Sequence, residues 1–179
     1  MAQIIVSRSF GKPVNNLKAL KEAISSHLTR AMEKLRSQNS VAESLTVFIQ
    51  TNRFQTSFEG YHHQLSFELP LPSHDTQEFL KIALSTVERL FCKGLNYKKA
   101  GVVLSDISQK GERQFDLFEA CPEKTGKFME LLDHINQKMG QGKLRYAIEG
   151  YEKDWQMQSS HRSPCYTTRW DELPVVKAI

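Results

Sequence analysis

The chain has 179 residues, of which 40% are hydrophobic and 25% are charged, and its formal net charge is +4. This composition is typical of a folded protein with an ordinary core and excludes a disordered chain. No apolar run is long enough to span a bilayer, and the first residues lack the pattern of a secretory signal. The three cysteines are too scattered for a disulfide framework. We therefore expect a cytoplasmic protein without membrane contact.

The positive charge is concentrated in the first third of the chain. Residues 1–53 contain eight lysines and arginines against three glutamates. A basic N-terminal part favours a surface that faces phosphate groups, although solvated helix faces would give the same count.

The first elements are a strand and a helix. A β-rich apolar run at residues 4–10 is ended by Gly11 and Pro13. Asn15 or Asn16 can then cap a helix. Its apolar residues recur every three to four positions, as expected for a helix with one buried face: Leu17, Leu20, Ile24, Leu28, Ala31 and Leu35.

Two strands and a second helix follow. Apolar and polar residues alternate at 45–50 and again at 63–69, which predicts half-buried strands. Asp75 and Glu78 have the spacing of a capping box, and Gly94 is a typical helix stop.

A last alternation at residues 100–104 completes the order βαββαβ. Both helices can cover one face of a four-stranded antiparallel sheet, which leaves the other face open. We therefore predict an α+β, ferredoxin-like domain over residues 1–106. Polar residues such as Thr46 and Gln50 would line the open face and suit contacts with a sugar-phosphate backbone. Strict alternation would place Arg8 on the same face of its strand as the apolar residues Val6 and Phe10, and not on the open face. The sequence therefore leaves the orientation of Arg8 open.

A five-residue motif lies in the linker predicted at residues 107–123. It consists of Gln114, Phe115, Asp116, Leu117 and Phe118. Bacterial proteins use this form to bind the hydrophobic cleft of the sliding DNA clamp, with two apolar anchors and a glutamine that fixes the register. The alternative is a turn or strand edge folded onto the core, because such pentapeptides are common.

Residues 124–179 predict a small C-terminal α/β module. Thr125 can cap a helix, and residues 144–148 resemble a short strand. The predicted apolar stripe of this helix is Phe128, Leu131, Leu132, Ile135 and Met139. The aromatic tail would dock on another surface.

No metal or catalytic site is expected. His62 and His63 are adjacent on a strand and would face opposite ways, and no cysteine or carboxylate is spaced to help them.

Several segments together resemble one protein family. Residues 7–14 resemble the opening of the little finger domain in UmuC-type Y-family polymerases, the catalytic subunits of bacterial DNA polymerase V. Residues 44–49 and 97–102 continue the match, and the pentapeptide follows where that family carries its clamp-binding motif. Residues 155–157 and 163–170 look like the small C-terminal domain of the same proteins, except that Cys165 stands where the family usually has a basic residue.

The resemblance implies a role in error-prone translesion synthesis during SOS DNA repair. The little finger sheet would straddle the major groove of primer–template DNA and grip its backbone. The matching residues are Ser7, Arg8, Ser9, Thr46, Thr51, Arg53, Lys98 and Lys99. Partners implied by the resemblance are the DNA, the β subunit that forms the sliding clamp, the processed accessory subunit UmuD′ and the recombinase RecA.

The family's palm, fingers and thumb have no counterpart in this sequence. Two-metal nucleotidyl transfer needs a carboxylate cluster on the palm, where Mg²⁺ would bind. We therefore expect no cofactor in this chain and no polymerase activity from it alone. Two alternatives stay open: the chain complements a separate catalytic polypeptide, or it occupies the clamp and excludes other polymerases.

Overall fold

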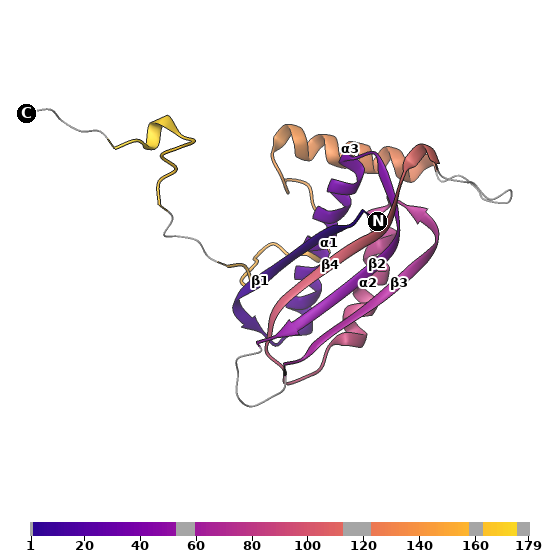
Figure 1. The fold of residues 1–179 in the computed structure, drawn as a ribbon, viewed down its shortest axis with the longest axis horizontal. Helices are drawn as coiled ribbons and strands as arrows, with labels where there is room; N and C mark the ends of the chain where they lie inside the picture. Colours follow the sequence, from indigo (N-terminus) through magenta and orange to yellow (C-terminus); the bar gives the residue numbers. More distant parts are fainter. Residues whose placement is uncertain (1, 53–59, 113–122, 158–162, 175–179) are drawn as a thin grey trace, which may run out of the picture.

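Four strands form one antiparallel sheet in the order β1-β4-β2-β3 (Figure 1). The structure is a computed structural model that describes residues 2–52, 60–112, 123–157 and 163–174. The strand bounds are Ile4–Val14 for β1, Ser40–Thr51 for β2, His62–Ser73 for β3 and Tyr97–Gln109 for β4. The predicted order βαββαβ is confirmed.

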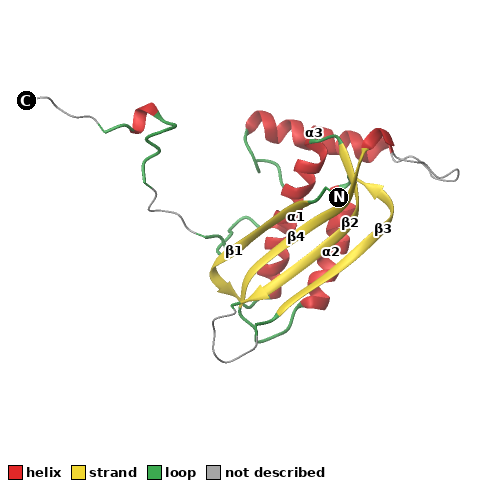
Figure 2. Cartoon of the chain, viewed as in Figure 1, coloured by secondary structure: helices red, strands yellow, loops and turns green. Residues whose placement is uncertain are grey.

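Two helices, α1 (Leu17–Ser37) and α2 (Thr76–Leu90), cover the same face of this sheet. Figure 2 shows both of them behind the strands, which leaves the near face without a helical cover. Asn16 caps α1, because its side chain accepts a hydrogen bond from the Lys18 N–H at 2.9 Å. Asp75 caps α2 in the same way through the Gln77 N–H at 2.8 Å. Both caps satisfy amide groups that a helix start would leave unpaired.

The core lies between the sheet and the two helices. Leu45, Val47 and Ile49 of β2 are fully buried, whereas the residues between them are half-buried on the other face. This difference follows from the two-residue period of a strand, which sends neighbouring side chains to opposite faces. The alternation seen in the sequence therefore identified the core face correctly.

Strand β3 is longer than the sequence predicted. The alternation predicted a strand over residues 63–69, yet the strand continues through Pro70 and Pro72 to Ser73. Because β3 lies at the edge of the sheet, its outward-facing amide positions have no ladder partner, and proline is tolerated there.

The C-terminal part is short and helical. Helix α3 spans Glu123–Met139 and begins before Thr125, so the predicted cap at Thr125 is wrong. The strand predicted at residues 144–148 is also absent, since a 3₁₀ helix, η2, forms at Ala147–Glu149. A further 3₁₀ helix, η3, spans Trp170–Glu172. None of the described helices is both long and apolar enough to cross a membrane.

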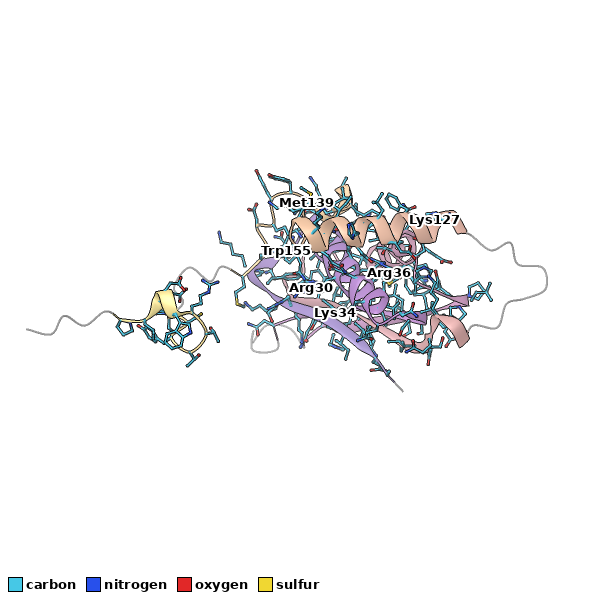
Figure 3. All side chains as sticks on the ribbon, turned by 90° about the horizontal axis from the view of Figure 1, so that it is seen from above. Arg30, Lys34, Arg36, Lys127, Met139 and Trp155 are labelled. Atoms are coloured by element: carbon cyan, nitrogen blue, oxygen red, sulfur yellow. The ribbon has the colours of Figure 1, made fainter. Side chains whose placement is uncertain are left out.

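Helix α3 forms a third layer on the far side of α1 from the sheet (Figure 3). Its buried apolar residues are Met129 and Leu132, whereas Leu131 and Met139 are exposed. The predicted apolar stripe therefore combined two faces of the helix. Adjacent apolar residues at 131 and 132 made the orientation ambiguous, and the ion pair of Arg36 on α1 with Asp133 on α3 fixes it.

Trp155 attaches the segment that follows η2 to the main core. Its ring packs edge-on against Phe10 of β1 and His27 of α1, with ring centroids 6.0 and 5.7 Å away. Its backbone carbonyl accepts a hydrogen bond from the Gly11 N–H at 3.0 Å. The expectation that the aromatic tail docks on another surface is met at this tryptophan.

Candidate nucleic-acid interface

The open face of the sheet carries a regular grid of side chains from all four strands. The strand register aligns three rows, each in the order β1, β4, β2, β3: Ile5, Val103, Thr46 and Ser66; Ser7, Gly101, Phe48 and Gln64; Ser9, Lys99, Gln50 and His62. Hydroxyl, amide and imidazole groups dominate these rows. Lys99 is their cation, and none of the twelve positions is acidic.

Gly101 is required at the centre of this face. A Cβ atom at this position would lie 2.4 Å from Ser7 Cβ and 2.6 Å from Phe48 Cζ. The Phe48 ring therefore packs over the glycine, and a larger residue would push it off the sheet. The result is a flat surface, which can approach a polymer backbone closely.

Phe48 also organises its polar neighbours. The Lys99 ammonium lies 5.9 Å from the centroid of the Phe48 ring, a cation–π distance, and the His62 ring stacks at 6.4 Å with an angle of 28°. In the next row the hydroxyls of Thr46 and Ser66 are hydrogen-bonded at 2.8 Å. The face thus presents an ordered positive charge beside neutral donors, which is the chemistry that recognises phosphodiesters.

The structure brings four of the predicted DNA-facing residues together. Ser7, Ser9, Thr46 and Lys99 all lie in the three rows of the open face. Because they come from three different strands, only the sheet register places them on one surface.

The other predicted residues lie elsewhere or are engaged. Arg8 pairs with Ala100 in the register, so it belongs to the helix-covered side of β1. The Lys98 ammonium donates a hydrogen bond to the Phe10 carbonyl at 3.2 Å. The Thr51 hydroxyl accepts one from the Tyr61 N–H at 2.9 Å. Arg53 lies outside the described residues.

The predicted clamp-binding residues Gln114, Phe115, Asp116, Leu117 and Phe118 also lie outside the described residues. What the structure describes before them is the end of β4 and a 3₁₀ turn, η1, at Lys110–Glu112.

The two adjacent histidines face opposite ways, as the strand pattern predicted. His62 stacks on Phe48 of the open face, whereas His63 stacks on Tyr61 with centroids 4.0 Å apart. In the described part of the chain, no three histidine, cysteine or carboxylate side chains are grouped in a way that would hold a metal ion.

Comparison with known proteins places the chain in a family. Residues 1–117 match the model of the impB/mucB/samB family C-terminal domain, and residues 126–176 match a domain of unknown function, DUF4113. The chain belongs to the impB/mucB/samB family. It is 36% identical over 177 residues to protein SamB of Salmonella typhimurium and 34% identical over 177 residues to protein UmuC of the same species. These alignments cover 98% of this chain and 42% of each relative, so the chain spans less than half of their length.

Among solved structures, the fold resembles that of Dbh DNA polymerase in an insertion ternary complex. The TM-score is 0.51 at 14% sequence identity, and the match covers 60% of this chain and 29% of the polymerase. At this identity the likeness shows the fold alone. The sequence resemblance to the C-terminal region of UmuC-type polymerases is thereby confirmed, together with the little-finger-like sheet.

Two features of this impB/mucB/samB family chain were missed by sequence reasoning. The first is Gly101, whose role depends on a register that a single strand does not reveal. The second is a cluster of cations, Arg8, Arg30 and Lys34, that β1 and α1 bring together. The sequence signals for that cluster are the excess of basic residues over positions 1–53 and the four-residue spacing of Arg30 and Lys34, and both are also typical of a solvated helix face.

Proposed function

We propose that this chain grips the backbone of primer–template DNA with the open face of its sheet, as the C-terminal part of an error-prone translesion polymerase. The observation that carries the proposal is the row containing Lys99, where a cation and neutral hydrogen-bonding groups lie on a face that none of the described helices covers. Membership of the impB/mucB/samB family supports it.

Such a face binds any DNA sequence about equally. Hydroxyls, amides and a lysine that contact phosphate and sugar position a duplex but carry no base information. Each phosphate neutralised by a cation releases counterions, so affinity falls as salt rises. A surface of this kind suits an enzyme that must hold whatever sequence it is copying.

A salt titration of binding to a primer–template duplex tests the proposal. Lys99→Ala should weaken binding and reduce the slope of log affinity against log salt by about one. Lys127→Ala is the matched control, because it removes the same charge from exposed α3, away from the sheet (Figure 3). Equal effects of the two substitutions would show that general charge, and not the open face, binds DNA.

The pentapeptide at residues 114–118 supports a second part of the proposal, namely binding to the bacterial sliding clamp. Leu117 and Phe118 would anchor the peptide in the hydrophobic cleft of the clamp, and Gln114 would fix its register. We expect micromolar affinity, about −8 kcal/mol, and its loss in the double variant Leu117→Ala, Phe118→Ala. Unchanged binding by the double variant would refute this part while leaving the DNA-binding part intact.

A further inference from the structure

A basic groove runs between the edge strand β1 and helix α1, on the covered side of the sheet. Its volume is about 420 Å³. Residues 5–9 of β1 form one wall, the α1 residues Ser26, His27, Arg30 and Lys34 form the other, and residues 155–157 close one end. We call this feature the β1 groove. It lies at the β1 edge beside the open face: Val6 and Arg8 belong to the covered side of β1, whereas Ile5, Ser7 and Ser9, which also line the groove, belong to the rows of the open face.

The strand that lines the β1 groove has a free edge. β1 is the outermost strand of the sheet and pairs, within the described residues, with β4 on one side. An edge strand presents a row of backbone N–H and C=O groups that can pair with another extended chain. The wall of the groove therefore offers a template for one more strand.

The chain's own backbone already uses this edge at one point. The Gly11 N–H donates to the Trp155 carbonyl at 3.0 Å, and a Cβ on Gly11 would lie 2.7 Å from the Gln156 carbonyl oxygen. Backbone thus approaches backbone at Gly11. The neighbouring residues 5–9 face the open groove instead.

The charge of the groove selects what can enter it. Arg8 projects from β1, while Arg30 and Lys34 lie one turn apart on α1 (Figure 3). None of the described residues that line the groove is acidic. Three cations on facing walls, without a carboxylate to neutralise them, favour a negatively charged occupant.

His27 adds an unsatisfied polar group to the wall. Its side chain is only 4% exposed, and its Nε2 atom has no hydrogen-bond partner among the described residues. Burial, with the charges of Lys153, Arg8 and Arg30, lowers the pKa of His27 to about 4. The imidazole is therefore neutral at pH 7 and can donate or accept one further hydrogen bond.

We propose that the β1 groove binds an extended acidic peptide of a partner protein, which adds as a fifth strand beside β1. A peptide strand satisfies both properties of the site, because its backbone pairs with residues 5–9 and its carboxylates meet the three cations. A nucleic-acid strand would satisfy the charges but has no alternating N–H and C=O groups to pair with the edge. Along about 17 Å of strand, every second side chain of the peptide would face the cations.

The test uses designed peptides and the complete 179-residue chain. The probe is a fluorescein-labelled, capped eight-residue peptide with glutamate at every second position and valine or threonine between. One comparison peptide has glutamine in place of glutamate. Another keeps the glutamates but is N-methylated at alternate residues, which removes the donors that would pair with β1. We expect binding of the probe, at least tenfold weaker binding of the glutamine peptide, and loss of binding on N-methylation.

Variants of the chain locate the site. The double substitution Arg30→Ala, Lys34→Ala should weaken probe binding at least tenfold, while the matched pair Lys127→Ala, Lys138→Ala on α3 should leave it unchanged. All four side chains are exposed, so folding is retained, as circular dichroism would verify. Absence of probe binding, equal binding of the N-methylated peptide, or tighter Arg30- and Lys34-dependent binding of a single-stranded oligonucleotide would each overturn the proposal.

Discussion

Arg36 of α1 and Asp133 of α3 form a bidentate ion pair that connects helix α3 to the sheet domain. Arg36 Nε lies 2.5 Å from Asp133 Oδ2, and Arg36 Nη2 lies 2.8 Å from Asp133 Oδ1. The two side chains are only 7% and 15% exposed. Arg36 also donates to the hydroxyl of Thr76, the first residue of α2, at 2.7 Å. One arginine therefore connects three helices.

Loss of either partner of this pair should be costly. Asp133→Asn leaves the guanidinium without its counter-charge in a largely buried site, and we expect the free energy of unfolding to fall by about 3 kcal/mol. A double-mutant cycle with Arg36→Met, followed by urea denaturation, measures the coupling between the two residues. A coupling energy of about 1–3 kcal/mol is expected for a direct contact. A coupling indistinguishable from zero would mean that the pair does not hold α3 in place.

Trp155 should contribute more stability than the other tryptophan of the chain. Trp155 is 5% exposed and packs on Phe10 and His27, whereas Trp170 is 89% exposed. Trp155→Ala should therefore cost about 3–5 kcal/mol, the range for removing a buried aromatic side chain. Trp170→Ala is the matched control and should change stability by less than about 0.5 kcal/mol. Thermal unfolding of the two variants side by side gives the comparison, and similar losses would contradict the docking of Trp155.

Gly101 should tolerate no side chain. Gly101→Ala forces a Cβ against Ser7 and Phe48, and the resulting overpacking should destabilise the chain by about 1–3 kcal/mol. Gly126→Ala is the control, because Gly126 lies in α3 and the nearest atom to an added Cβ is 3.9 Å away. That change should be neutral or stabilising by up to about 1 kcal/mol, since alanine favours helix more than glycine does. If both variants had wild-type stability, the close packing of the open face would be disproved.

His27 should make stability depend on pH in the acidic range. Its pKa falls from 6.5 to about 4 through burial and through the charges of Lys153, Arg8 and Arg30. The unfolded chain therefore takes up the proton first as the pH drops. Stability from the neutral imidazole is complete above pH 6.5 and is lost as the pH falls toward 4, by about 3 kcal/mol in total.

A variant without the titrating group isolates this effect. The difference in unfolding free energy between the wild-type chain and His27→Gln should shrink by about 3 kcal/mol between pH 7 and pH 4. Urea denaturation at a series of pH values measures it. A difference that stays constant with pH would show that His27 is not held neutral in the folded chain.

The sheet and its two covering helices were predictable because their signals are local. The alternation of Leu45, Val47 and Ile49 and the caps at Asn16 and Asp75 act within a few residues of the chain. The C-terminal part was predicted less well. Its helix α3 is oriented by the ion pair between Arg36 and Asp133. These two residues are 97 positions apart in the sequence, so no local pattern predicts their contact.

The candidate site shows the same limit. Alternation along β2 identified Thr46 and Gln50 as outward-facing, and the structure keeps them on the open face. Alternation along β1 could not decide the direction of Arg8. The register of β1 against β4 settles that question, because it is continuous through Arg8 and shifts only after Ser9.

Mapping the DNA contact by NMR would show directly whether the open face of the sheet binds DNA. The isotope-labelled chain would be titrated with a primer–template duplex while backbone amide shifts are followed by NMR. We expect shift changes concentrated at Ser7, Lys99, Gly101 and Phe48, with little change along α2. Changes concentrated on the helices, with these four amides unmoved, would contradict the assignment of the open face as the DNA-binding surface.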